Sequence, residues 1–271
     1  MIKLIVSDMD GTLFTNDKRF PPDFFEILTQ LHARGVHFVA GSGRSYPAQK
    51  QSFAAVIDKM DFICDNGAYV VENGKLVFLA TMPRAEVVAM AKAAEQIGEN
   101  IYPILCGVKN TYLHEIPEAL AQQGGIRTYY AHAVTCEDFS QIDDDIFKIA
   151  ICDLQDAGTH LYPPLQAQFG EHFGVAHSGP HWVDIMQKGI NKGTAVRNLQ
   201  QRLGIAPEET MVFGDFYNDV EMLACAKYSF IMENADQGMF QYGNYRAPSN
   251  ENYGVATVIR RHVLENIPFN E

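Results

Sequence analysis

Two aspartates, Asp8 and Asp10, follow a short apolar run near the start of the chain. Carboxylates placed in this way can act as a nucleophile, as a general acid or base, or as metal ligands. The run, residues 2–6, is too short for a buried helix and predicts a buried parallel strand. Ligands bind at the carboxyl ends of such strands, so both acids lie where chemistry is usually done. An Asp-Gly pair alone also fits an ordinary turn, so the hypothesis needs partners elsewhere in the chain.

Further polar residues follow other predicted strands, and a lysine opens a predicted helix. They are Ser42, Gly43 and Arg44 after the segment 36–40, Asp215, Asn218 and Asp219 after the segment 211–213, and Lys192 at the start of a helix over 192–203. Strand ends rich in small and polar residues, together with one lysine, form a set that can share a single site.

The elements that must position these residues alternate between strand and helix. Residues 1–81 predict a helix opened by Pro21-Pro22 and ended by Gly35, a helix over 45–56, a strand over 61–64 and a hairpin turning at Asn73-Gly74. This order implies a parallel sheet, and the same pattern resumes after residue 186, ending in a helix over 255–264. We therefore predict an α/β protein with a Rossmann-like core formed by residues 1–81 and 187–271.

Residues 82–186 have a different pattern of short predicted strands and helices, which indicates an inserted α+β domain. Apolar alternation predicts strands near 101–105, 112–114, 147–151 and 183–185, with helices over 85–97, 115–123 and 159–169. These strands would form a mixed sheet of their own.

The set of motifs resembles the haloacid dehalogenase-like superfamily. Its four motifs are matched in order by DMDGT at residues 8–12, Ser42, Lys192 and GDFYND at residues 214–219. The segments DNGA at 65–68 and DIMQKGINKG at 184–193, together with the tail 234–256, look like the Cof-like sugar-phosphatase branch. The resemblance implies a catalytic core with an inserted cap domain, here residues 82–186, that sets substrate specificity.

Phosphoryl transfer gives the two aspartates different roles. The reaction needs an in-line nucleophile, neutralised phosphate oxygens and a proton for the leaving group. We expect Asp8 to attack phosphorus and form an aspartyl-phosphate. Asp10 would protonate the leaving alcohol and later deprotonate the attacking water. The single variants Asp8→Asn and Asp10→Asn should therefore lose activity unequally. Asp8→Asn removes the nucleophile, whereas Asp10→Asn should still allow some phosphorylation by a substrate with a good leaving group.

The same acids predict a magnesium site. Two carboxylates and a phosphate in one pocket repel one another unless a divalent cation lies between them, and Mg²⁺ prefers oxygen ligands. The expected ligands are a carboxylate oxygen of Asp8, the backbone carbonyl of Asp10 and the carboxylate of Asp215. Asp219 would bind either directly or through water. An acidic side chain is also favoured in the first turn of a helix, so Asp219 could serve the next helix as well.

Five residues are expected to bind the phosphate or substrate: Ser42, Gly43, Arg44, Lys192 and Asn218. The Ser42 hydroxyl and the backbone N–H groups of Gly43 and Arg44 would form an anion cradle at a helix start. Lys192 would place a charge on the phosphate and on Asp8. Arg44 could equally form a structural ion pair, and Asn218 could be an ordinary N-cap.

Candidate substrate contacts in the cap are Lys109, Tyr112, His114, Lys148, His181 and Trp182. Surface or packing roles are the alternative for each of them. His181 and Trp182 are the favoured pair, because they lie just before the chain returns to the core. Phe216 and Tyr217 depart from the small residues often found inside GDxxND and are expected to narrow the site.

The composition of the chain limits which binding partners and which cellular compartment we expect. The chain has 271 residues, 47% hydrophobic, and a formal charge of -12, which argues against binding to nucleic acid or an anionic membrane. Its five scattered cysteines predict neither disulfides nor zinc. No apolar run suits a membrane span and no signal peptide is visible, so we expect a cytoplasmic protein, either a monomer or a homodimer.

The leading hypothesis is a Mg²⁺-dependent phosphatase of small phosphomonoesters, with sugar phosphates as the expected class. A phosphomutase or phosphotransferase would use the same residues and pass the phosphoryl group to a sugar. A non-catalytic phospho-acceptor or sugar-phosphate sensor is a third alternative. Asp10 counts against the sensor, since a receiver domain needs no acid for a leaving group.

Overall fold

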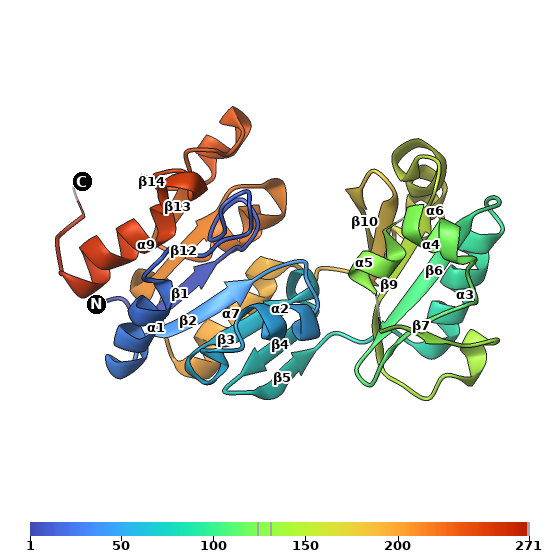
Figure 1. The fold of residues 1–271 in the computed structure, drawn as a ribbon, viewed down its shortest axis with the longest axis horizontal. Helices are drawn as coiled ribbons and strands as arrows, with labels where there is room; N and C mark the ends of the chain where they lie inside the picture. Colours follow the sequence, from blue (N-terminus) through green and yellow to red (C-terminus); the bar gives the residue numbers. More distant parts are fainter. Residues whose placement is uncertain (124, 131, 270–271) are drawn as a thin grey trace. The chain divides into compact units, whose positions relative to one another are not determined.

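The computed structural model describes residues 1–123, 125–130 and 132–269. The chain forms two compact units (Figure 1). The first comprises Met1–Phe78 and the described chain from Asn191 onward, and the second comprises Leu79–Ile190. The domain boundaries predicted from the sequence were residues 81 and 186. Among the described residues, no helix is both long enough and apolar enough to cross a membrane.

The described part of the first unit contains an eight-stranded sheet in the order β14-β13-β12-β1-β2-β3-β4-β5. Its strands are β1 (Leu4–Ser7), β2 (His37–Gly41), β3 (Asp61–Cys64), β4 (Tyr69–Glu72), β5 (Lys75–Leu79), β12 (Thr210–Gly214), β13 (Tyr228–Met232) and β14 (Tyr245–Ala247). The strands from β14 to β3 run parallel, and β4 pairs antiparallel with β3. The predicted α/β class is confirmed, with an antiparallel hairpin added at one edge. Asn73 and Gly74 have φ values of 50° and 72°, as expected for the turn of that hairpin.

Three strands whose ends carry the candidate residues lie next to one another. In the register of the sheet, Ser7 of β1 lies opposite Phe213 of β12 on one side and Ala40 of β2 on the other. Asp8, Asp215 and Ser42 therefore follow strands that end level at one edge. This arrangement is what the apolar runs in the sequence predicted.

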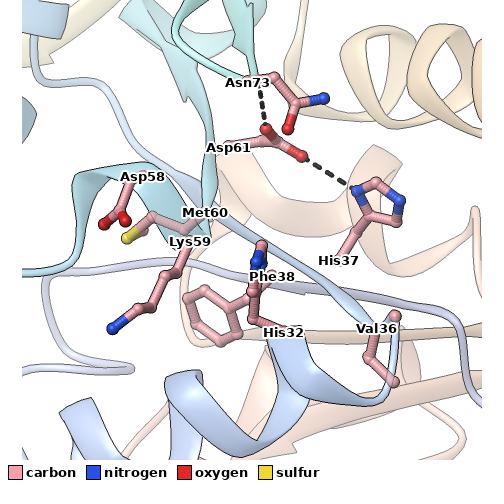
Figure 2. Close-up of a pocket in the computed structure, with 10 residues that line it drawn as sticks. His32, Val36, His37, Phe38, Asp58, Lys59, Met60, Asp61 and Asn73 are labelled. Atoms are coloured by element: carbon pink, nitrogen blue, oxygen red, sulfur yellow. Dashed lines mark hydrogen bonds and ion pairs between the residues drawn. The ribbon is translucent and has the colours of Figure 1, made fainter.

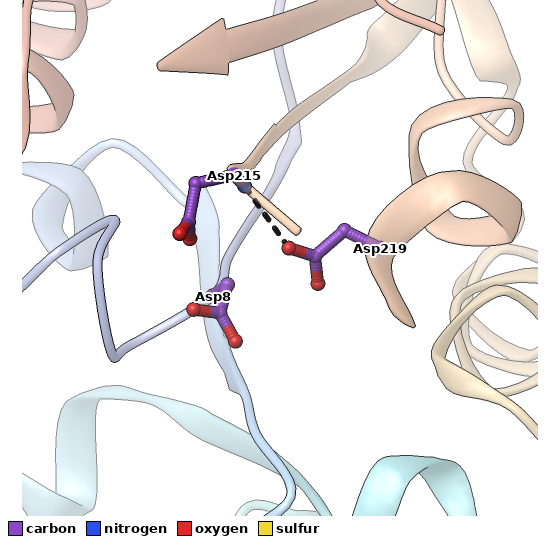
Figure 3. Close-up of side chains that lie close together, drawn as sticks. All are labelled: Asp8, Asp215 and Asp219. Carbon is purple, nitrogen blue, oxygen red and sulfur yellow. Dashed lines mark hydrogen bonds between the residues drawn. The ribbon is translucent and has the colours of Figure 1, made fainter. Parts of the chain in front are cut away.

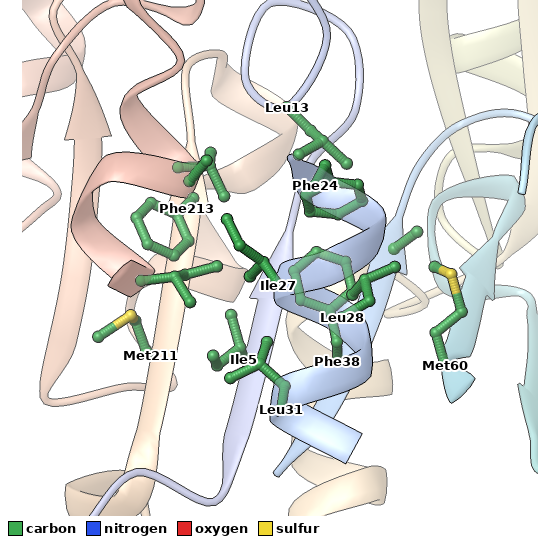
Figure 4. Close-up of a cluster of buried hydrophobic side chains, with 14 of the residues drawn as sticks. Ile5, Leu13, Phe24, Ile27, Leu28, Leu31, Phe38, Met60, Met211 and Phe213 are labelled. Atoms are coloured by element: carbon green, nitrogen blue, oxygen red, sulfur yellow. The ribbon is translucent and has the colours of Figure 1, made fainter. Parts of the chain in front are cut away.

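Helices cover both faces of this sheet, and each face has its own apolar core. The helices are α1 (Phe24–Ala33), α2 (Tyr46–Ser52), α7 (Lys192–Leu203), α8 (Val220–Leu223) and α9 (Gly254–Ile259). On one face, Phe24 and Leu28 of α1 pack with Ile5, Phe38 and Phe213 of the strands (Figure 4). On the other face, α7 and α8 cover apolar residues of the same strands.

Several helix boundaries differ from the predicted ones. Helix α1 begins at Phe24, after Asp23, and not at Pro21-Pro22. Helix α2 ends at Ser52, because Phe53 and then Val56 turn into the core instead of continuing the helix. The last helix divides into α9 and a π-helical turn, η9 (Arg260–Leu264). Strand β14 was not predicted, since three residues are too few to show alternation.

The second unit forms a six-stranded sheet among its described residues, in the order β10-β11-β9-β6-β7-β8. The strands are β6 (Ile101–Gly107), β7 (Thr111–Leu113), β8 (Val134–Thr135), β9 (Ile146–Asp153), β10 (Phe173–Gly179) and β11 (Trp182–Gln187). The helices are α3 (Arg84–Glu95), α4 (Glu118–Gln123), α5 (Ile126–Tyr129) and α6 (Tyr162–Phe169). Only β7 and β8 pair in parallel among these strands, so the sheet is mixed, as predicted. Strands β8 and β10 were not predicted.

Short helical turns connect the longer elements. They are η1 (Ile57–Lys59), η2 (Asp65–Gly67), η3 (Phe139–Gln141), η4 (Ala157–Leu161), η5 (Pro207–Glu209), η6 (Tyr217–Asp219), η7 (Gln237–Gln241) and η8 (Asn250–Asn252). Two of them, η2 and η6, follow β3 and β12 closely and contribute residues to the candidate site.

Candidate active site

Three aspartates meet at the carboxyl edge of the sheet in the first unit. Asp8 follows β1, Asp215 follows β12, and Asp219 ends the turn η6 (Figure 3). One carboxylate oxygen from each lies within 4.8 Å of the others. Asp8 and Asp219 are buried, and Asp215 is partly exposed. These three side chains form what we call the acid cluster.

Lys192 lies against the acid cluster as the first residue of α7. Its Nζ donates to Asp8 Oδ1 at 2.5 Å and to Asp219 Oδ1 at 2.7 Å. The side chain of Asn191 caps α7 by accepting from Thr194 N at 2.8 Å, which fixes where the helix begins. The next residue must be small, since a Cβ on Gly193 would lie 2.4 Å from the carbonyl oxygen of Glu221. Lys192 is thus fully buried at a defined position.

The acid cluster contains more negative charge than Lys192 balances. Burial raises the pKa of Asp8 to about 8; Lys192 opposes this shift, and the carboxylates of Asp219 and Asp215 add to it. Burial also raises the pKa of Asp215 to about 6. Burial alone would lower the pKa of Lys192, but Asp219 and Asp8 outweigh it and raise that pKa. Three acids and one ammonium group form a site that is short of positive charge.

Asp219 is engaged with the protein through both of its oxygens. Oδ1 accepts from Lys192, and Oδ2 accepts from the backbone N–H groups of Asp215 at 3.0 Å and Phe216 at 3.2 Å. Asp215 accepts from the Thr12 hydroxyl at 2.5 Å through Oδ1. A Cβ on Gly11, whose φ is +88°, would lie 2.3 Å from Asp215 Oδ2, so the glycine of the DGT motif leaves room for this carboxylate.

The donor set of the acid cluster fits a divalent cation. Carboxylate oxygens are the ligands that Mg²⁺ prefers, and the unbalanced charge would be offset by two positive charges. Since Asp219 is held by Lys192 and backbone N–H groups, Asp8 and Asp215 are the acids better placed to offer an oxygen directly. Whether Asp219 binds through water, and whether the backbone carbonyl of Asp10 contributes, remain predictions.

Asp10 is not a member of the acid cluster and pairs with two cations. Arg44 donates to both of its oxygens, from Nε at 2.8 Å and from a terminal nitrogen at 2.6 Å, and Lys18 Nζ donates at 2.7 Å. Burial would raise the pKa of Asp10, but these hydrogen bonds outweigh it and lower that pKa. Of the two roles considered for Arg44, this structure contains the ion pair. The Asp10 carboxylate is therefore ionised and doubly held here.

The predicted phosphate cradle lies beside a strained turn. Ser42 Oγ accepts from Arg44 N at 3.1 Å, and Asn218 Nδ2 donates to Asn66 Oδ1 at 3.2 Å. A Cβ on Gly43 would lie 3.2 Å from Asn66 Nδ2. Asn66 has a φ of 52°, a left-handed conformation that is uncommon outside glycine. Backbone strain of this kind is often found at functional sites.

Comparison with known proteins assigns the family. A family model described as haloacid dehalogenase-like hydrolase matches residues 5–259. The chain belongs to this family. The resemblance seen in the sequence, including its Cof-like branch, is thereby confirmed. As a haloacid dehalogenase-like hydrolase of this branch, the protein is a hydrolase of phosphoric monoesters, in agreement with the names of its relatives.

Individual relatives cover nearly the whole chain. It is 32% identical to the 5-amino-6-(5-phospho-D-ribitylamino)uracil phosphatase YbjI of Escherichia coli over 100% of this chain and 99% of the relative. It is 25% identical to the pyridoxal phosphate phosphatase YbhA of the same organism, over 97% and 99%. A solved structure from Eubacterium rectale has a TM-score of 0.87 and 25% identity, over 96% and 98%.

The candidates from the second unit of this hydrolase make contacts within that unit. Lys109 Nζ donates to Asp143 O at 2.6 Å, the Tyr112 hydroxyl donates to Asp144 at 3.1 Å, and His114 Nδ1 is 2.7 Å from Cys136 O. These contacts agree with the packing roles that the sequence left open. His181 Nδ1 is 3.0 Å from Asp153 O, Trp182 packs on the Tyr130 ring, and Lys148 is buried in β9. That His181 and Trp182 contact substrate stays a prediction.

Three residues of the site were not assigned a role from the sequence. Thr12 donates to Asp215, Lys18 donates to Asp10, and Asn66 accepts from Asn218. Asn66 carried a usable signal, because an Asn-Gly pair after a strand is typical of left-handed backbone. Lys18 carried none, since its contact depends on how the loop around it folds.

Proposed function

We propose that this chain hydrolyses small phosphomonoesters with Mg²⁺ as cofactor, through an aspartyl-phosphate on Asp8. The observation that carries the proposal is the acid cluster: among the described residues, three carboxylates offer oxygens within 4.8 Å of one another, and the ammonium group of Lys192 pairs with two of them, Asp8 and Asp219. A site short of positive charge is costly unless a cation completes it. The membership in a phosphatase family supports the same conclusion.

Asp8 is proposed as the nucleophile. Its carboxylate attacks phosphorus, the bond to the alcohol oxygen breaks, and the phosphoryl group stays on Asp8 until water attacks phosphorus and releases phosphate. The raised pKa of Asp8 would oppose this role, because attack requires the ionised carboxylate. Bound Mg²⁺, held directly by Asp8 and Asp215 and by Asp219 either directly or through water, would supply positive charge that lowers this pKa and polarises the phosphoryl group.

Asp10 is proposed as the general acid and base. Ionised, as its contacts with Arg44 and Lys18 keep it, the carboxylate suits the second step, in which a base takes a proton from water. To donate a proton in the first step, it must first leave these cations. The anionic phosphate of a substrate would compete for Arg44 and Lys18, and the released Asp10 would take up a proton from solvent, which it then donates to the leaving alcohol oxygen.

The phosphate would be bound by groups around the same edge. The Ser42 hydroxyl and the backbone N–H of Gly43 are proposed to donate to its oxygens, and Lys192 to place its charge beside them. Asn218 would orient the phosphate together with Asn66. Because each donor is itself held by a hydrogen bond or by a helix start, little reorganisation would be needed when the phosphate binds.

Two substrate classes deserve direct comparison. Sugar phosphates are the class that the sequence resemblance implies. The two Escherichia coli relatives are named for substrates in which the phosphate is carried by a molecule with a flat heterocycle, a uracil and a pyridoxal. A substrate panel should therefore contain both classes.

Hydrolysis of a generic aryl phosphate by the purified protein tests the proposal. We expect turnover with Mg²⁺, none after chelation, and none from the Asp8→Asn variant. Retained activity in Asp8→Asn would contradict the nucleophile, and full activity after chelation would contradict the cofactor. Adding sugar acceptors and looking for transfer products separates a phosphatase from a phosphotransferase, and stoichiometric phosphorylation without turnover would indicate a phospho-acceptor.

A further inference from the structure

Two aromatic rings are exposed in the loop that carries Asp215. Phe216 and Tyr217 are 56% and 50% exposed, although they lie between two residues of the site, Asp215 and Asn218. Their rings contact each other edge to face, with centroids 5.5 Å apart and planes at 75°. The proposed chemistry uses neither ring. Large apolar side chains left exposed beside a charged site are typical of a surface that binds a ligand.

The backbone of Phe216 is fixed by the acid cluster itself. Its N–H donates to Asp219 Oδ2 at 3.2 Å, and its carbonyl oxygen accepts from Asp219 N at 2.9 Å. The same carboxylate of Asp219 accepts from Asp215 N, as Figure 3 shows, and from Lys192. The ring of Phe216 is therefore carried by a rigid backbone next to a proposed metal ligand, and a ligand would bind it at little cost in ordering.

Tyr217 is packed on a glycine and supports Phe216 from one side. A Cβ on Gly238, in η7, would lie 2.7 Å from the Tyr217 hydroxyl oxygen, so the close approach of this ring depends on a missing side chain. Tyr217 then presents its ring to Phe216 in the edge-to-face geometry that aromatic pairs favour. Phe216, the more exposed of the two, keeps ring surface available to a ligand.

We propose that Phe216, supported by Tyr217, is a stacking subsite for the alcohol part of the substrate, and that it selects phosphate esters whose alcohol carries a flat aromatic ring. The inference rests on the proposed phosphatase function and names its substrate class. The phosphate would bind at the carboxyl edge of β1, β2 and β12, and Phe216 directly follows Asp215 in the loop after β12, so its ring belongs to the same edge of the sheet. A flat ring can stack on Phe216 in offset or edge-to-face geometry, whereas a saturated ring or an open chain cannot.

Binding to a variant without turnover tests the subsite independently of catalysis. In the Asp8→Asn background, calorimetry would compare benzyl phosphate with cyclohexylmethyl phosphate, which have equal numbers of carbon atoms and differ in the flatness of the ring. We expect benzyl phosphate to bind more tightly, and Phe216→Ala to reduce this preference by roughly 2- to 12-fold. Phe216→Tyr should restore the preference, and Phe216→Leu should not.

The matched control is Phe25→Ala, which removes an exposed phenylalanine of α1 outside the site. It should leave the preference unchanged. A ratio of affinities that is the same before and after Phe216→Ala would overturn the subsite, and so would an equal loss for both ligands, since that result would assign the ring to packing. Failure of the wild-type protein to hydrolyse any ester would contradict the proposed function, whereas the binding ratio would still report on the subsite.

Discussion

The carboxylates at the two edges of the eight-stranded sheet have different partners. At the carboxyl edge, Asp8, Asp215 and Asp219 lie together, and Lys192 donates to Asp8 and Asp219. At the amino edge, Asp61 begins β3 and lies 3.2 Å from Nδ1 of His37, which begins β2. Asp61 also accepts from Asn73 N at 2.8 Å (Figure 2). These residues line a hollow of about 220 Å³.

The difference between the edges is one of charge balance. Asp61 is a single buried carboxylate with a histidine and a backbone N–H as partners, so its charge and its hydrogen bonds are satisfied within the protein. The acid cluster has three carboxylates against one amine; burial raises the pKa of Asp8 and of Asp215, and the neighbouring carboxylates add to both shifts. A satisfied acid stabilises the fold, whereas an unsatisfied cluster is prepared for a ligand.

Asn substitutions at the two edges should have opposite consequences. Asp8→Asn should lower kcat by at least about 10³-fold, because the nucleophile is lost, while leaving Tm unchanged or higher, because repulsion in the acid cluster falls. Asp61→Asn should retain activity and lose about 1 kcal/mol of stability. Phosphatase assays and thermal melts of both variants measure this. A lower Tm for Asp8→Asn would contradict the charge imbalance.

Removing the amine of Lys192, which pairs with the acid cluster, should have the largest effect on stability. Lys192→Met leaves buried carboxylates without their cation, so we expect a loss of roughly 3–5 kcal/mol in urea unfolding. Added Mg²⁺ should recover part of the loss. The matched control is Lys75→Met at an exposed position, which should change stability little. Equal stability of the two variants would show that Lys192 does not balance the cluster.

Mg²⁺ should stabilise the folded protein through the acid cluster. A cation that binds only the native state adds about 2.7 kcal/mol at a concentration one hundred times its Kd. We expect Tm to rise with MgCl₂ in the wild type and in Asp17→Asn, which changes an exposed acid that pairs with Arg19 outside the cluster, and to rise much less in Asp215→Asn. A rise of the same size in Asp215→Asn would place the ion elsewhere.

The smallest effect is expected at the amino edge, as a dependence on pH. The hydrogen bond to Asp61 raises the pKa of His37 above its usual value, and its burial opposes this. A raised pKa in the folded state means that the pair stabilises the protein fully below the unfolded pKa of about 6.5 and loses this contribution as pH rises through the folded pKa. His37→Gln should therefore cost about 0.5 kcal/mol at about pH 5.5 and less at about pH 8.5, allowing for solvent screening. Urea unfolding at the two pH values measures this loss of stability. A loss that grows with pH would contradict the predicted direction of the pH dependence.

The position of the site could be predicted because short apolar runs end where its residues begin. Residues 2–6, 36–40 and 211–213 predicted strands, and their polar successors do meet at one edge. The helix start at Lys192 was also predicted, and the structure adds that the side chain of Asn191 caps this helix. The local sequence pattern was therefore sufficient to predict the position of a site residue wherever that position depends only on where a strand or helix begins or ends.

The remaining features depend on contacts between distant parts of the chain. Arg44 reaches Asp10 across 34 residues, and its choice between substrate and ion pair depends on side-chain orientation, which no local pattern specifies. Helix α2 ends early because Phe53 is more stable in the core than in a continued helix. The left-handed conformation of Asn66 depends likewise on the packing of Gly67, where a Cβ would lie 2.3 Å from Asn191 O.

Trapping the phosphorylated enzyme tests the central claim most directly. Protein mixed with Mg²⁺ and an ester carrying radiolabelled phosphate would be quenched in acid within a turnover, digested, and its labelled peptide sequenced by mass spectrometry. We predict label on Asp8, released by hydroxylamine as expected for an acyl phosphate, and absent from Asp8→Asn. Turnover without any covalent label, or label on another residue, would contradict the account.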